Sequence, residues 1–265
     1  MDRPMRPMPE ELFRRIVDQA AAMKIPEICP NGFGEVMTLK SIENHLSYIR
    51  SKSHRFRIVM NTNGFRMSGE KLESLLRHEV DLLNICIDGA TKEVAEAVRV
   101  NLKLDAIEEN ILTLMRLRRE RNLSLPKIRV GMVIIPQNQH EVDAFVGKWK
   151  GKVDYIGVDP YSNRAGSLDG KFSDTKTESV GGGTCLLPFR ELNIWADGKA
   201  VLCCNDWNAE HVVGDANVSS LHEIWHGKLL MAARESHSRK MGDELKICKA
   251  CNYWKKPRPL TRLWK

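Results

Sequence analysis

Residues 56–64 read Phe-Arg-Ile-Val-Met-Asn-Thr-Asn-Gly, an apolar run that stops at a polar loop. This pattern predicts a strand over Phe56–Met60, because β-branched and aromatic residues suit a buried pleated surface and Asn and Gly suit turns. Leu82–Ile87 repeats the pattern and ends in the turn pair Asp88-Gly89. Helical periodicity separates the two runs. Strand, loop and helix in succession predict a parallel sheet with crossover helices.

The same alternation continues in both directions over the first 160 residues. Apolar runs predict three further strands, over Ile25–Cys29, Ile128–Ile135 and Val153–Val158. Periodic stretches predict helices over 9–24, 39–52, 91–98, 105–121 and 139–150. A parallel α/β domain normally begins with a strand, whereas here a helix comes first. We therefore expect a barrel-like domain whose opening strand and loop are absent from this chain.

Composition excludes several classes of protein. The chain has 265 residues, of which 42% are hydrophobic, enough for one large domain and a small appendage. It lacks an apolar run of about 18 residues and the apolar core of a signal peptide, which predicts no membrane association and a cytoplasmic location. The net charge is +7, but the basic residues are dispersed. Local clusters over 116–121 and 255–262 are expected to be a solvated helix face and a basic tail, with no nucleic-acid partner.

Three loops at predicted strand ends carry polar residues and glycine: 31–35, 61–64 and 88–91. Turn and capping chemistry would explain any one of them. However, the carboxyl ends of parallel strands share one edge of the sheet, where ligands bind in such folds. Glycine permits close backbone approach to a ligand, and Glu35 is placed to meet a cationic amine. Together, the three loops predict a ligand site.

Five of the seven cysteines lie between residues 185 and 251. Cys185 precedes a predicted hairpin, Cys203 and Cys204 end it, and Cys248 and Cys251 form a C-x-x-C pair. Four thiolates suit an iron–sulfur cluster or structural zinc, and the spacing leaves both open, as well as no metal. Successive strand residues face opposite sides, so only one of the adjacent pair should face a metal. Four histidines are expected to be surface or packing residues: His211, His222, His226 and His237.

On these motifs the chain resembles radical S-adenosylmethionine (SAM) enzymes with an auxiliary cluster domain of the SPASM or shortened twitch type. Residues 32–35 resemble the family's Gly-Gly-Glu-Pro loop, with Val36 at the usual proline, and residues 62–64 resemble its Thr-Asn-Gly motif. Residues 85–89 resemble the fourth-strand motif, with Cys86 where serine is usual. The resemblance implies SAM contacts from Gly32, Gly34, Glu35, Thr62, Asn63, Cys86 and Arg129.

The second half resembles the auxiliary domain in the order of its motifs: residues 185–189, 197–204, 220–225 and 248–251. The resemblance implies one [4Fe–4S] cluster held by Cys185, Cys203, Cys248 and Cys251, with Cys203 preferred over Cys204. The implied fold class is α/β: a partial (β/α)6 TIM-like barrel without its first strand over 1–160, a linker over 161–184, and a small α+β SPASM or twitch domain over 185–265.

The family's defining C-x-x-x-C-x-x-C triplet does not occur in these 265 residues. Either the chain is an amino-terminal truncation, or it is a degenerate homologue that acts as a metal-containing binding or scaffold protein. The resemblance implies hydrogen abstraction from a small-molecule or peptide substrate, with flavodoxin or ferredoxin as reductant. Without the triplet we expect no SAM cleavage by this chain, and we assign it no catalytic residue.

Overall fold

The structure is a computed structural model that describes residues 6–53, 55–168, 183–254 and 262–264. It divides into two compact units. The sheet unit comprises Ile25–Tyr161 and Pro259–Lys265, and the cysteine unit comprises Met1–Lys24 and Ser162–Arg258. Much of the predicted linker and basic tail, residues 169–182 and 255–261, lies outside the described residues.

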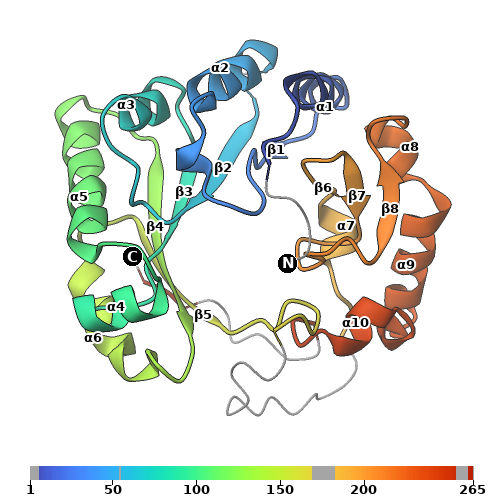
Figure 1. The fold of residues 1–265 in the computed structure, drawn as a ribbon. Helices are drawn as coiled ribbons and strands as arrows, with labels where there is room; N and C mark the ends of the chain where they lie inside the picture. Colours follow the sequence, from blue (N-terminus) through green and yellow to red (C-terminus); the bar gives the residue numbers. More distant parts are fainter. Residues whose placement is uncertain (1–5, 54, 169–182, 255–261, 265) are drawn as a thin grey trace. The chain divides into compact units, whose positions relative to one another are not determined.

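The five predicted strands of the sheet unit are confirmed and lie side by side in parallel (Figure 1). They are β1 (Glu27–Ile28), β2 (Arg57–Thr62), β3 (Leu82–Cys86), β4 (Lys127–Ile134) and β5 (Tyr155–Pro160). A sixth strand, β9 (Arg262–Trp264), joins the sheet antiparallel to β5. The chain's last described residues therefore return to the edge of the first domain's sheet, which the sequence pattern did not indicate.

Helices cover one face of this sheet (Figure 1). They are α2 (Ile42–Lys52), α3 (Glu70–Arg77), α4 (Lys92–Val98), α5 (Leu104–Glu120) and α6 (Val142–Trp149), with short 3-10 turns η1 (Val36–Thr38) and η2 (Gln139–Glu141). Alternate strand residues, such as Leu83 and Ile85 of β3, are completely buried. The residues between them, Asn84 and Cys86, are only partly buried. Because successive side chains of a strand point to opposite faces of the sheet, one face is apolar and lies beneath the helices, and the other face carries polar groups.

The cysteine unit is built around a small antiparallel sheet in the order β6-β7-β8. Its elements are α1 (Glu10–Ala22), α7 (Leu187–Arg190), β6 (Asn193–Ile194), β7 (Lys199–Val201), β8 (Val212–Asp215), α8 (Leu221–Trp225), α9 (Lys228–Ser238), η3 (Gly242–Glu244) and α10 (Lys246–Ala250). The predicted hairpin is confirmed as β6 and β7. Gly198 takes φ +92° in its turn, a left-handed conformation that favours glycine.

Helix α1 differs from our expectation, which placed it in the barrel domain over 1–160. Its Leu12 belongs to the apolar core of the cysteine unit, together with Leu202 and Leu230. Gln19 accepts a hydrogen bond from the Leu221 backbone N–H at 2.8 Å, and Arg15 donates to the backbone of residues 216 and 217. Amphipathic periodicity shows that a helix buries one face but not what covers that face.

No helix in the described part of the chain is both long and apolar enough to span a bilayer.

Candidate functional site

Glu35 joins two of the three predicted loops at the carboxyl edge of the parallel sheet. It follows β1, and Gly34 before it takes φ +92°, which a residue with a side chain adopts at a cost. Glu35 Oε1 accepts the Thr62 hydroxyl at 2.6 Å and the Met37 amide at 2.9 Å. Glu35 Oε2 accepts the Asn63 amide at 2.7 Å. The loop after β1 is thus tied to the end of β2.

These hydrogen bonds leave Glu35 with spare capacity. A carboxylate offers about four lone-pair positions, and three are used here. The remaining position is on Oε2, because Oε1 already accepts two hydrogens. Glu35 is half-buried, so its carboxylate is held in place and partly open. It can accept one further donor, and a cationic amine suits its charge.

A chain of asparagines continues along the same edge. Asn31 Nδ2 donates to the Asn61 carbonyl at 3.0 Å, and the Asn61 amide donates to Asn31 Oδ1 at 3.1 Å. Asn84 Nδ2 then donates to Asn61 Oδ1 at 3.1 Å. Our sequence reasoning did not single out Asn84. An amide within the apolar run 82–87 was a signal, because it marks the strand face that is not packed against helices.

Arg129 and Cys86 lie on this partly polar face of the sheet. Arg129 Nη2 contacts Asp159 Oδ2 at 2.6 Å across β4 and β5. The guanidinium lies directly over Gly157, where a Cβ would overlap it. Asp159 was not predicted, because a contact between two strands requires their register. Within the described residues Arg129 Nη1 makes no hydrogen bond, so it stays available to an anion.

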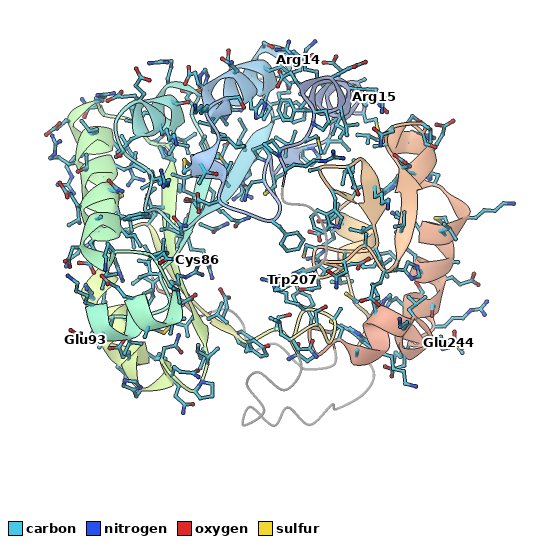
Figure 2. The ribbon with its side chains drawn as sticks, in the orientation of Figure 1. Arg14, Arg15, Cys86, Glu93, Trp207 and Glu244 are labelled. Carbon is cyan, nitrogen blue, oxygen red and sulfur yellow. The ribbon has the colours of Figure 1, made fainter. Side chains whose placement is uncertain are left out.

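Cys86 lies at the end of β3, in register with Gly131 of β4 (labelled in Figure 2). Burial raises the pKa of its thiol, with the Arg99 guanidinium opposing that effect. The group is therefore a neutral thiol at pH 7, which can donate or accept a weak hydrogen bond. That chemistry is compatible with the position where serine is usual in the family.

The third predicted loop uses its polar groups internally. Asp88 pairs with Arg99 at 2.7 Å and accepts the Val133 amide at 2.7 Å. Glu141 accepts the Ala90 amide at 2.7 Å and the Thr91 hydroxyl at 2.5 Å. For this loop the ordinary turn chemistry is sufficient. The open ligand-binding groups thus come from the first two loops and from the sheet face.

Four cysteines are buried in the cysteine unit, each 6–7% exposed: Cys185, Cys203, Cys248 and Cys251. Three of them belong to one apolar core that also contains Trp254. Burial, and after it the neighbouring sulfurs of Cys251 and Cys185, raise the pKa of the Cys248 thiol to about 12. Burial also raises the pKa of Cys203, near which Cys248 and Cys251 lie. The four sulfurs therefore share one electrostatic environment.

Cys203 and Cys204 have different surroundings, but not through the strand alternation that the sequence predicted, because β7 ends at Val201 and both cysteines lie in the bend and turn that follow it. Burial, and then the negative charge of Glu191, raise the pKa of Cys204 to about 12, and the thiol hydrogen-bonds the Glu191 side chain. Cys203 instead receives a hydrogen bond from the Asn205 backbone. Cys248 and Cys251 act on Cys203, whereas the largest influences on Cys204 after burial come from Glu191 and Arg164.

In the part of the chain that the structure describes, no group of three His, Cys, Asp or Glu side chains could hold a single metal ion as placed. The sulfurs of an iron–sulfur cluster bind separate iron atoms, so they lie farther apart than sulfurs around one zinc ion. A donor set of four buried thiols, three of them in one core and the fourth, Cys203, near two of those, fits such a cluster chemically.

His237 is placed differently from the other three histidines that the sequence singled out. We expected a surface or packing residue, and the ring is completely buried, but its Nε2 lies 3.4 Å from Cys248 Sγ. His222 and His226 are exposed, and His211 is half-buried. The sequence offered little signal, because His237 is separated from Cys248 by a helix end and a turn.

Comparison with known families identifies the class of protein. Residues 1–147 match the sequence model of the radical SAM superfamily, and residues 185–252 match SPASM, an iron–sulfur cluster-binding domain. The chain therefore belongs to the radical SAM superfamily and carries a SPASM domain, which confirms the resemblance and the fold class. SAM and an iron–sulfur cluster, the cofactors that the resemblance implied, are those of this family and domain.

Solved structures share the fold at low identity. BtrN in complex with AdoMet and 2-DOIA is 16% identical, with a TM-score of 0.61 over 94% of this chain and 82% of BtrN. Streptococcus suis SuiB bound to its precursor peptide SuiA is 15% identical, with a TM-score of 0.69 over 93% of this chain and 65% of SuiB. Native anSMEcpe with bound AdoMet is 14% identical, with a TM-score of 0.64 over 91% of this chain and 79% of that protein. The comparison with curated proteins gives no match.

Proposed function

We propose that this chain binds SAM and one auxiliary [4Fe–4S] cluster and serves hydrogen abstraction from a small-molecule or peptide substrate. The observation that carries the proposal is the Glu35 carboxylate, held by Thr62 and Asn63 with one lone pair open at the carboxyl edge of the sheet. Reductive cleavage of SAM would supply a 5′-deoxyadenosyl radical to take a hydrogen atom from the substrate, and it would need an electron from a second cluster, whose C-x-x-x-C-x-x-C triplet these 265 residues do not contain. SuiB binds a peptide and BtrN a small molecule, which supports both substrate classes.

Each predicted SAM residue has a role in this proposal. The Glu35 carboxylate accepts hydrogen bonds from the ammonium group of the methionine moiety. Thr62 and Asn63 hold the Glu35 carboxylate in place. Arg129 Nη1 attracts the methionine carboxylate, and its other end stays paired with Asp159. Backbone at Gly32 and Gly34 approaches the ligand closely, because no side chain intervenes. The Cys86 thiol offers a weak hydrogen bond from the sheet face.

The substitution Glu35→Gln tests the SAM site. It removes the charge and points an amide donor at neighbouring donors, so we expect SAM affinity to fall roughly 10- to 100-fold. Isothermal titration with SAM measures this. Glu120→Gln is the matched control, because Glu120 is an exposed carboxylate paired with Arg116. Equal SAM affinity for wild type and Glu35→Gln would contradict the proposed site.

For the cluster we propose Cys185, Cys203, Cys248 and Cys251 as ligands, supported by their burial and shared surroundings. After anaerobic reconstitution we expect about four irons and four sulfides per chain. Cys203→Ala should lose most of the bound iron, whereas Cys204→Ala should keep it. Iron and sulfide analysis of the two variants decides between adjacent residues of the same chemistry. Iron loss in Cys204→Ala alone would reverse the assignment.

A second candidate is a degenerate homologue that binds without reacting, favoured by the missing C-x-x-x-C-x-x-C triplet in these 265 residues. We propose that this polypeptide by itself releases no 5′-deoxyadenosine from SAM under anaerobic reduction. If a version extended upstream to include such a triplet also releases none, the scaffold function is favoured. Zinc without iron or sulfide would point the same way.

We also propose a flavodoxin or ferredoxin as reductant and a cytoplasmic location. The location is supported by the cysteine usage, because none of the seven cysteines, all within the described residues, forms a disulfide.

A further inference from the structure

His237 occupies a slot built against one of the buried cysteines. It lies on α9 and is 0% exposed, with Nε2 3.4 Å from Cys248 Sγ. The Trp254 ring meets the imidazole edge-on, with centroids 5.4 Å apart. On another side lies Gly242, where a Cβ would come within 2.6 Å of the imidazole. Trp254 also donates from Nε1 to the Cys248 carbonyl at 3.0 Å, so ring, indole and cysteine form one packed group.

Hydrogen-bond chemistry determines which of His237 and Cys248 is the donor and which is the acceptor once a metal is bound. A metal-bound thiolate has no proton, so Cys248 Sγ can only accept. A neutral imidazole carries one N–H and one bare nitrogen, so the hydrogen must be on Nε2. Nδ1 is then the bare nitrogen. In the described part of the chain Nδ1 has no hydrogen-bond partner, so no neighbouring group holds the proton on Nδ1 instead.

We propose that His237 donates a hydrogen bond from Nε2 to Cys248 Sγ and thereby raises the reduction potential of the auxiliary cluster. The proposal rests on the function proposed above, in which Cys248 is a cluster ligand. Hydrogen bonds to the sulfurs of a cluster stabilise its reduced form, which carries more negative charge. His237 acts through Cys248 and is therefore a positioning residue that tunes the cluster.

The first test compares reconstituted wild type with His237→Phe, which keeps a planar ring and removes the donor. We expect the one-electron reduction equilibrium to become about tenfold less favourable, a fall of about 59 mV in midpoint potential. His237→Gln keeps a donor and should restore part of the shift. His45→Phe is the matched control, since His45 is a buried histidine of the sheet unit. Potentials are read by redox titration with electron paramagnetic resonance (EPR).

The second test uses the unmutated protein, so it holds even if a variant fails to fold. With ¹⁵N-labelled histidine, pulsed EPR of the reduced cluster should show one weak nitrogen coupling. A strong coupling would mean that His237 is itself a ligand, and no coupling would mean no contact, and either result overturns the proposal. So would equal potentials in wild type and His237→Phe. If wild type holds no iron, the proposed function fails instead, which keeps the two failures distinguishable.

Discussion

At the scale of single residues, two carboxylates near the same sheet edge have opposite uses. Glu35 keeps one lone pair open toward a ligand. Glu141 is 5% exposed, and its carboxylate oxygens accept hydrogen bonds from Ala90 and Thr91. These bonds hold the residues that precede α4 in place. Burial alone would raise the pKa of Glu141, but the hydrogen bonds from Thr91 and Ala90 outweigh it and lower the pKa below its ordinary 4.5.

The substitution Glu141→Gln should therefore destabilise the fold by roughly 1–3 kcal/mol at pH 7, because the new amide faces existing donors. A lowered pKa in the folded state stabilises the protein above about pH 4.5, and that stability is lost as the pH falls through the folded pKa. The difference between wild type and variant should thus shrink in acid. Urea unfolding at pH 7 and pH 4 measures it.

Glu93→Gln is the control for this prediction, because Glu93 lies exposed on the same helix α4 (Figure 2). It should change the free energy of unfolding by less than about 0.5 kcal/mol. A Glu141→Gln effect that is equal at both pH values would show that the charge is not the cause.

At the scale of elements, two glycines of β4 and β5 leave space on the sheet for the Arg129 side chain. Gly131 and Gly157 are in register, and Arg129 lies across Gly157 to reach Asp159. Glycine weakens a strand, so two glycines side by side need a local reason. The space required by the guanidinium supplies that reason.

Gly157→Ala should displace Arg129 from Asp159 and cost about 1–3 kcal/mol of stability, because the new methyl group overlaps the guanidinium. Thermal unfolding measures the stability, and SAM titration should show weakened binding if Arg129 serves the ligand. Gly147→Ala in α6 is the matched control, since a Cβ there meets nothing within 4 Å. It should be neutral or stabilising, because alanine favours a helix more than glycine does. Equal losses in both variants would refute this account of Arg129.

At the scale of the whole molecule, the two units draw on both ends of the chain. The cysteine unit includes α1, and the sheet unit includes β9. A unit assembled from distant segments has its stability spread over all of them. Metal binding stabilises the folded unit that holds the ligands.

Hydrogen exchange should show this partition. Reconstitution with iron and sulfide should slow amide exchange in α1 together with α9, and leave β2–β4 nearly unchanged. Mass spectrometry of peptic peptides from the metal-free and reconstituted protein measures it, with α3 of the sheet unit as the internal control. If α1 exchanges like α3 while α9 slows, α1 does not belong to the cysteine unit.

The sequence alone was enough for the five parallel strands, their covering helices and the hairpin. Apolar periodicity and turn residues act locally, and each of these elements is specified within a short window. The buried cysteines and the Glu35 loop were also predictable, because their residue types and order are distinctive.

The tertiary structure decided which segments meet. It placed α1 against Leu202 and Leu230, paired Arg129 with Asp159, and brought His237 to Cys248. It also separated Cys203 from Cys204 by their surroundings, where spacing only required that they differ. The physical reason is that local patterns show that a group must be buried or paired, whereas its partner depends on strand register and packing between residues far apart in the chain.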